Sequence, residues 1–133
     1  MNLSLYEAVL YTDDVPATAA FYEHTLGLRV VKEPTTLMAV LRPSGDPGPV
    51  ILIFNRTEAA QPGREVPSHG AHGAGHLALR MTSGEYEAWK SRLASKNIAT
   101  EREVRWETGA RSLYFRDPAG NSVELVENEI WPL

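Results

Sequence analysis

The chain of 133 residues contains no cysteine. Disulfide bonds, thiolate metal ligands and a cysteine nucleophile are therefore excluded, so any bound metal must be held by nitrogen and oxygen atoms. No run of residues approaches the roughly 20 apolar residues that a membrane-spanning helix requires. The N-terminus also lacks the basic-then-apolar pattern of a signal peptide. We therefore expect a cytoplasmic protein that does not bind membranes.

The sequence also has no excess of positive charge. Its net charge is −4 at pH 7, and the basic residues are scattered along the chain, so there is no electrostatic footprint for nucleic acid. The expected partner is a small organic molecule. Hydrophobic residues make up 43% of the chain, which is enough to bury the core of one compact domain of this length.

The first half of the chain predicts a strand, a helix and three further strands. Apolar and polar residues alternate from Leu3 to Tyr11, which predicts a strand with Glu7 in its interior. Asp13 and Asp14 supply N-cap oxygens for a helix that runs to Leu26 and ends at Gly27. The further strands are expected at residues 28–32, 36–42 and 49–55, with a turn at residues 43–48.

The second half repeats this order of elements. Residues 56–75 are rich in proline and glycine and have no apolar period, so we expect a loop that links the two halves. A strand follows at His76–Met81, and Thr82 with Glu85 has the spacing of a capping box for the next helix. Tyr86, Trp89 and Leu93 are the expected core face of that helix, and strands are expected at residues 98–104, 110–116 and 121–126. The predicted fold class is α+β, built from two βαβββ modules.

Three strands of the second half place polar side chains on one face. If Leu77 and Leu79 face the core, the alternation of a strand turns His76 to the opposite face. The same alternation separates Glu124 from its apolar neighbours, and separates Ser112 and Tyr114 from Leu113 and Phe115. The segment Asp117-Pro118-Ala119-Gly120 fits a type I turn that sets the register of the strand carrying Glu124.

With these motifs the chain resembles the vicinal oxygen chelate superfamily. That superfamily includes glyoxalase I, extradiol dioxygenases, methylmalonyl-CoA epimerase, and the fosfomycin and bleomycin resistance proteins. The resemblance rests on three groups of residues: Asp14-Val15 with Phe21-Tyr22 and Leu26-Gly27-Leu28; Gly75-His76-Leu77-Ala78; and Phe115-Arg116-Asp117-Pro118-Ala119-Gly120-Asn121 with Val123-Glu124.

The resemblance implies a single glyoxalase-like domain over residues 1–133. Its first βαβββ module spans residues 1–55, residues 56–75 form the linker, and the second module spans residues 76–133. The modules of this superfamily form a cupped mixed sheet with the helices outside, often in a homodimer, and a divalent metal lies in the cup. The modules can pair within one chain or be exchanged between chains.

The resemblance also implies the metal ligands. These are Glu7, His76 and Glu124, holding Fe²⁺, Mn²⁺, Zn²⁺ or Ni²⁺. The fourth ligand position falls in the strand of residues 49–55, where Asn55 is the only polar residue. Here the chain departs from four-ligand members such as glyoxalase I, which use a glutamate. Glu7 also departs from the two-histidine, one-carboxylate set of the extradiol enzymes.

Each candidate residue also has an ordinary structural interpretation. Strand histidines such as His76 are commonly structural, and Glu7 could instead pair with Arg80 or Arg116. Tyr114 resembles the second-sphere tyrosine of extradiol enzymes, where it would donate a hydrogen bond to a bound oxygen; alternatively its ring only lines the pocket.

The remaining histidines and Trp131 are assigned no chemistry. His69 and His72 lie in a glycine-containing loop, where we expect them to be solvated, and His24 is expected at the surface of the first helix. The loop could form a lid over a cavity. Trp131, near the C-terminus, is expected to cover either a cavity mouth or a dimer interface.

Two function hypotheses follow from different classes. The first is a metal-dependent lyase, isomerase or dioxygenase that acts on a small oxygen-rich molecule, with Glu7, His76 and Glu124 as ligands and Tyr114 as a catalytic residue. The alternative is a metal-free protein of the bleomycin-resistance type that sequesters a drug or metabolite. A glutathione-dependent enzyme is a third hypothesis, although no basic cluster suited to glutathione stands out.

Overall fold

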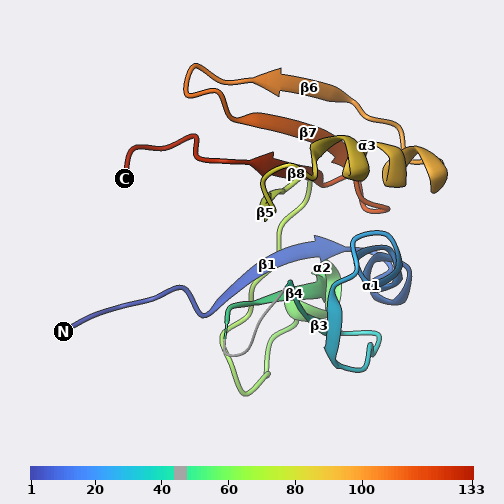
Figure 1. Cartoon of the computed structure of the whole chain (residues 1–133). Coiled ribbons are helices and arrows are strands. Elements are labelled where there is room, and N and C mark those ends of the chain that lie inside the picture. The colour runs from blue at the N-terminus through green and yellow to red at the C-terminus, as the bar shows by residue number, and fades with distance from the viewer. Residues whose placement is uncertain (44–47) are drawn as a thin grey trace. The chain divides into compact units, whose positions relative to one another are not determined.

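The computed structural model describes residues 1–43 and 48–133, which divide into two compact units, Met1–Gly75 and His76–Leu133 (Figure 1). Most of the turn predicted at residues 43–48 therefore lies outside the described residues. Within the described part of the chain, no helix is long and apolar enough to cross a membrane.

The first unit is a four-stranded mixed sheet with two helices. The strands lie in the order β1-β4-β3-β2; β1 pairs with β4 in parallel and the other pairs are antiparallel. In chain order the elements are β1 (Glu7–Thr12), α1 (Val15–His24), β2 (Arg29–Lys32), β3 (Met38–Arg42), β4 (Val50–Asn55) and α2 (Arg56–Ala59).

The limits of α1 follow from local chemistry. The Asp14 carboxylate accepts a hydrogen bond from the backbone N–H of Ala17 at 3.1 Å, which caps the helix as predicted. The helix ends at His24, two residues before the predicted end, and Gly27 follows with a φ of +75° that suits glycine. Val15, Ala19 and Tyr22 form the buried face of the helix.

Two predictions for this unit are wrong. β1 begins at Glu7 instead of Leu3, because its partner strand begins at Val50, which aligns with Glu7. Glu7 is therefore the first residue of the strand and not an interior one. The segment after β4 is not all loop either, since residues 56–59 form α2. A single helical turn is too short to show an apolar period in the sequence.

The second unit repeats the same sheet. Its order is β5-β8-β7-β6, again with one parallel pair, β5 with β8. The elements are β5 (His76–Met81), α3 (Tyr86–Ser95), β6 (Arg102–Arg105), β7 (Arg111–Arg116) and β8 (Ser122–Glu127). The predicted α+β fold with two βαβββ modules is thus confirmed.

The start of α3 and the start of β6 differ from prediction. Glu85 occupies the N-cap of α3 without any side-chain capping bond, so the predicted capping box is wrong. β6 begins at Arg102, because Ile98 instead donates a backbone hydrogen bond of 2.9 Å to Leu93 and closes the end of α3. Tyr86 and Leu93 of α3 are buried as predicted, while Trp89 is half-buried.

The turn before β8 matches its prediction. Gly120 donates a backbone hydrogen bond of 3.0 Å to Asp117, and the Asp117 carboxylate accepts from the N–H groups of Ala119 and Asn121 at 2.9 Å each. Gly120 has a φ of +85°, which a side chain would strain. This turn sets the register that aligns Glu124 with Tyr114 of β7.

Candidate metal centre

His76 and Glu124 meet on one face of the second sheet. The parallel register of β5 and β8 pairs His76 with Ser122 and Ala78 with Glu124, so the two side chains rise from neighbouring strands on the same side. The Nε2 atom of His76 lies 3.3 Å from Oε2 of Glu124. The prediction that these two residues share a face is confirmed.

The other nitrogen of His76 is held by the backbone of β8. Nδ1 lies 3.2 Å from the carbonyl oxygen of Ser122 and 3.3 Å from its hydroxyl. A carbonyl and a carboxylate both accept hydrogen bonds, so the ring can donate from Nδ1 to Ser122 or from Nε2 to Glu124. With the proton on Nδ1, the lone pair of Nε2 is directed toward Glu124. Histidine ligands in metal sites are commonly oriented in this way.

Glu124 is held by a chain of two further hydrogen bonds. Its side chain is almost completely buried, and its Oε1 accepts a hydrogen bond of 2.5 Å from the hydroxyl of Ser112. Trp106 in turn donates its indole N–H to the Ser112 hydroxyl at 2.8 Å. Oε1 is therefore occupied, while Oε2 is directed to His76. The alternation of residues in the sequence predicted Ser112 on this face without indicating a role for it. No feature of the sequence marked Trp106 as part of the site.

Tyr114 stands beside this pair. Its ring stacks on the imidazole of His76, with 6.3 Å between centroids and an interplanar angle of 21°. Burial raises the pKa of Tyr114, and the neighbouring negative charge of Glu124 raises it further. The phenol is therefore a hydrogen-bond donor at neutral pH, as the role considered for it requires.

The His76–Glu124 pair fits two ligands of one divalent cation. Metal bonds of about 2.0–2.2 Å at tetrahedral or octahedral angles place neighbouring ligand atoms roughly 3.0–3.4 Å apart. The observed separation of 3.3 Å lies in that range. With the His76 proton on Nδ1, the lone pairs of Nε2 and of the Glu124 carboxylate face each other, and a divalent cation between them would be attracted by both. Among the described residues, however, no three histidine or acidic side chains cluster as a complete metal site.

Glu7, the third expected ligand, lies in the other unit. It is the first residue of β1 and its side chain is exposed. The structure therefore brings His76 and Glu124 together within one unit, and Glu7 belongs to the other unit. The arginines considered as partners of Glu7 have carboxylate partners in their own unit: Arg80 contacts Glu129 at 2.7 Å, and Arg116 contacts Glu101 at 2.8 Å.

The two sheets can be compared position by position through their registers. Glu7 is the first residue of β1, and His76 is the first residue of β5. Two residues further along β1, Val9 aligns with Leu52 of β4. Two residues further along β5, Ala78 aligns with Glu124 of β8. The position equivalent to Glu124 is therefore apolar. Asn55 is no substitute ligand, because its side-chain oxygen caps α2 by accepting from two backbone N–H groups at 2.9 and 3.0 Å.

A cavity of about 610 Å³ lies over the His76–Glu124 pair. Aromatic side chains contribute much of its lining, including Trp106, Tyr114 and Trp131. Trp131 is 73% exposed and borders this cavity, which supports the expectation that it covers a cavity mouth. Its alternative role at a dimer interface stays a prediction.

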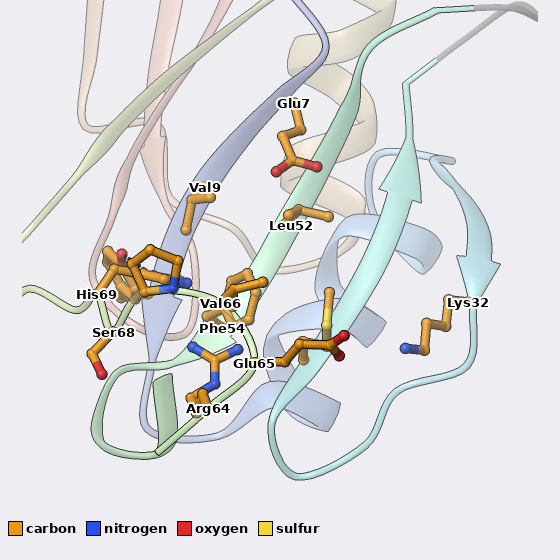
Figure 2. Close-up of a pocket in the computed structure, with 13 residues that line it drawn as sticks. Glu7, Val9, Lys32, Leu52, Phe54, Arg64, Glu65, Val66, Ser68 and His69 are labelled. Atoms are coloured by element: carbon orange, nitrogen blue, oxygen red, sulfur yellow. Dashed lines mark hydrogen bonds between the residues drawn. The ribbon is translucent and has the colours of Figure 1, made fainter. Parts of the chain in front are cut away.

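The first unit has its own cavity, of about 950 Å³, drawn in Figure 2. His69 lines it, with Nδ1 2.6 Å from the Tyr11 hydroxyl and its ring edge-on to Phe54 at 4.6 Å. The expectation of a solvated His69 is therefore wrong, because the fold packs the loop against β1 and β4. His72 is exposed, and His24 is exposed as predicted.

Comparison with known proteins places this geometry in context. The family model described as Glyoxalase/Bleomycin resistance protein/Dioxygenase superfamily matches residues 4–125. A lactoylglutathione lyase from Agrobacterium tumefaciens is 34% identical, with a TM-score of 0.89 over 98% of this chain and 97% of that one.

Two less similar structures share the fold. A glyoxalase/bleomycin resistance protein/dioxygenase from Nocardioides is 20% identical, with a TM-score of 0.75 over 100% of this chain and 91% of that one. A glyoxalase/dioxygenase from Nostoc punctiforme is 21% identical, with a TM-score of 0.69 over 95% and 91%. No protein of curated function matches the chain.

Proposed function

We propose that this chain, which belongs to the glyoxalase/bleomycin resistance protein/dioxygenase superfamily, is an enzyme that depends on a divalent metal. Its substrate is a small oxygen-rich organic molecule, and its reaction is that of a lyase, an isomerase or a dioxygenase. The observation that carries the proposal is the pairing of His76 Nε2 with Glu124 Oε2 at 3.3 Å. Glu7 is proposed as the third ligand.

The metal, when bound, supplies a Lewis acid that polarises a substrate oxygen and stabilises negative charge there. The surrounding side chains hold the ligands and the substrate. Ser112 fixes the Glu124 carboxylate, and the Ser122 carbonyl contact orients the ring of His76. Tyr114 keeps its proton at neutral pH and is placed to donate a hydrogen bond to a substrate oxygen beside His76.

The proposal is tested by elemental analysis of protein purified without chelator or affinity metal. We expect close to one equivalent of a divalent metal in the wild type, and its loss in a Glu7→Ala, His76→Ala, Glu124→Ala triple variant. The matched control is Glu107→Ala with His24→Ala, which removes an exposed acid and an exposed histidine away from the pair. If the wild type takes up no Fe²⁺, Mn²⁺, Zn²⁺ or Ni²⁺ on dialysis, the proposal is wrong.

The metal-free alternative is supported by a different observation. Each unit has a cavity large enough for a small molecule, of about 950 Å³ in the first unit and about 610 Å³ in the second. On this alternative the protein sequesters a drug or metabolite, and the dialysis experiment finds no metal while ligand binding persists. The two functions are thus separated by a single measurement.

The lactoylglutathione lyase among the relatives suggests the first substrate to assay. The hemithioacetal of methylglyoxal and glutathione tests the lyase reaction, and a catechol tests ring cleavage. Leu52 provides no ligand at the fourth position, so we expect little or no turnover of the hemithioacetal by the wild type. Turnover dependent on Glu124 would assign the chain to the lyase branch.

The proposal includes a homodimer, which the family resemblance implies. Light scattering coupled to size-exclusion chromatography measures the mass directly. We expect twice the 14.7 kDa of one chain.

A further inference from the structure

The cavity of the first unit has an apolar floor with an aromatic cluster at one side. Side chains of β1, β3 and β4 form the floor: Val9, Met38, Leu52 and Phe54. Leu52 and Phe54 are nearly inaccessible to solvent. Tyr11, Phe54 and His69 stand against one another, with ring centroids 4.6 to 5.8 Å apart. Figure 2 shows Val9, Leu52 and Phe54 below Glu7. Such a surface suits a flat apolar group.

Two cations also line this cavity. Arg64 lies over the Phe54 ring, with 5.7 Å from its guanidinium carbon to the ring centroid, and donates a hydrogen bond of 3.0 Å to the Ala59 carbonyl. Lys32 enters from β2. Among the described residues, neither cation has a carboxylate within ion-pair distance. The hydrogen bond to the backbone carbonyl of Ala59 thus holds the Arg64 guanidinium beside the apolar floor. Most of its N–H donors are left for an anion.

The carboxylates of the cavity do not cancel this charge. Glu65 is exposed and makes no ion pair with Arg64 or Lys32. Glu7 aligns with Val50 at the start of β4, whereas Arg64 lies over Phe54, four residues further along that strand. The cavity therefore offers an apolar surface, a cluster of rings in tilted and edge-on contact, and a fixed guanidinium. Its volume lies within the usual range of about 300–1,000 Å³ for small-molecule sites.

We propose that this cavity binds a planar aromatic anion. The ring system lies on the floor beside Val9 and Met38, which are partly accessible, and the anionic group pairs with Arg64 and secondarily with Lys32. As a binding site for the substrate, the cavity rests on the proposed function. Binding of the anion itself needs no metal, because none of these contacts involves His76 or Glu124.

The test uses two fluorescent probes with the metal-free full-length protein. The first is 8-anilinonaphthalene-1-sulfonate, an aromatic anion, and the second is N-phenyl-1-naphthylamine, which has the same rings without the sulfonate. We expect saturable binding of both probes, with the anion tighter. Arg64→Gln should weaken the anion roughly tenfold and Lys32→Gln roughly threefold, with the neutral probe changed by less than about twofold.

Matched variants separate local from general effects. Lys96→Gln removes an exposed lysine of the other unit and should change nothing. Val9→Glu places a negative charge on the cavity floor at a position already 37% exposed, so it should fold and should weaken the anion selectively. Val31→Glu, at an exposed position that does not line the cavity, is its control.

Two results would overturn the proposal. The first is equal affinity of the wild type for the two probes. The second is loss of anion binding in Trp131→Ala while Arg64→Gln binds the anion as tightly as the wild type does. That second result would place the probe in the cavity of the second unit. Failure of the proposed function has a different signature. In that case the wild type holds no metal, yet the anion still binds, and binding still depends on Arg64.

Discussion

The hydroxyl of Ser112 donates a hydrogen bond of 2.5 Å to Oε1 of Glu124, and both side chains are buried. The two residues lie on adjacent antiparallel strands, β7 and β8. The bond occupies one carboxylate oxygen and leaves the other for His76 or a cation. A buried carboxylate is costly unless its oxygens are paired, so Ser112 both stabilises and orients Glu124.

Ser112→Ala should therefore weaken the candidate metal site. The substitution leaves Oε1 of Glu124 and the indole N–H of Trp106 without their partner. We expect a loss of about 1–3 kcal/mol in the free energy of unfolding and metal binding weaker by roughly 10–100-fold. Urea denaturation measures the first and equilibrium dialysis the second. Ser95→Ala, at the exposed end of α3, is the control. Unchanged metal affinity in Ser112→Ala would show that Ser112 has no orienting role.

Tyr114→Phe tests whether the phenol is catalytic. If Tyr114 donates a hydrogen bond to a bound oxygen, its removal should lower kcat by roughly 10²–10⁴-fold with metal content unchanged. If the ring only lines the pocket, kcat should stay the same, because phenylalanine keeps the stacking on His76. Steady-state kinetics with parallel elemental analysis distinguish the two roles. The control is Tyr6→Phe, at an exposed tyrosine of the N-terminal segment.

Leu52→Glu tests the equivalence of Leu52 and Glu124. The register of β1 with β4 puts Leu52 where a fourth ligand would lie, so a carboxylate there should raise metal affinity. The apoprotein should lose about 1–3 kcal/mol in its free energy of unfolding, because Leu52 is buried. Isothermal titration with Zn²⁺ and Mn²⁺ measures the affinity, and Leu52→Met controls for the change of shape. Unaltered affinity in Leu52→Glu would argue against the equivalence.

Glu127 should make the protein sensitive to acid. Its carboxylate accepts hydrogen bonds from Arg111 at 2.9 and 3.1 Å and from the Gly84 N–H at 2.7 Å, and these contacts, with Arg111 foremost, hold its pKa below the ordinary value of 4.5. Because the pKa of Glu127 is lower in the folded state, its ionised carboxylate stabilises the folded protein above pH 4.5. This contribution to the free energy of unfolding is lost as the pH falls further.

Glu127→Gln measures this contribution. The difference in free energy of unfolding between wild type and Glu127→Gln should be largest at neutral pH and should shrink as the pH falls below 4.5. Urea denaturation over a pH series measures it, with Glu107→Gln at an exposed position as control. A difference that is constant over the series would contradict the assigned pKa shift.

Gly70→Ala should displace the loop that carries His69. A Cβ at Gly70 would lie 2.7 Å from the carbonyl oxygen of Arg56, which belongs to the backbone and cannot move aside cheaply. We expect a loss of about 1–3 kcal/mol in the free energy of unfolding, together with weaker binding of both fluorescent probes. His72→Ala, in the same loop but exposed, should leave both quantities unchanged.

The pattern of strands and faces could be predicted because it depends on local alternation. The period of two along β5, β7 and β8 placed His76, Tyr114 and Glu124 on one face, and the structure confirms that arrangement. The ends of elements were less predictable. β1 starts at Glu7 because a strand requires a hydrogen-bonded partner, and the position where β4 begins is set by the fold and not by residues 3–6.

The interactions that sequence reasoning missed join residues far apart in the chain. His69 meets Tyr11 across 58 positions, and Trp106 reaches Glu124 only through Ser112. A glycine-containing loop normally predicts exposure, since nothing local reveals which surface the loop covers. The mistaken expectation of a solvated His69 has that cause.

The sequence by itself determined which residue types were available for chemistry. It excluded thiolate ligands, supplied one histidine and one carboxylate on the same face of two strands, and left the fourth position apolar. Only the tertiary structure decided that Nε2 of His76 and Oε2 of Glu124 stand 3.3 Å apart, and that Ser112 and Trp106 hold the carboxylate. Side-chain periodicity is a property of the local backbone, whereas such distances depend on strand register and packing, which the whole fold establishes.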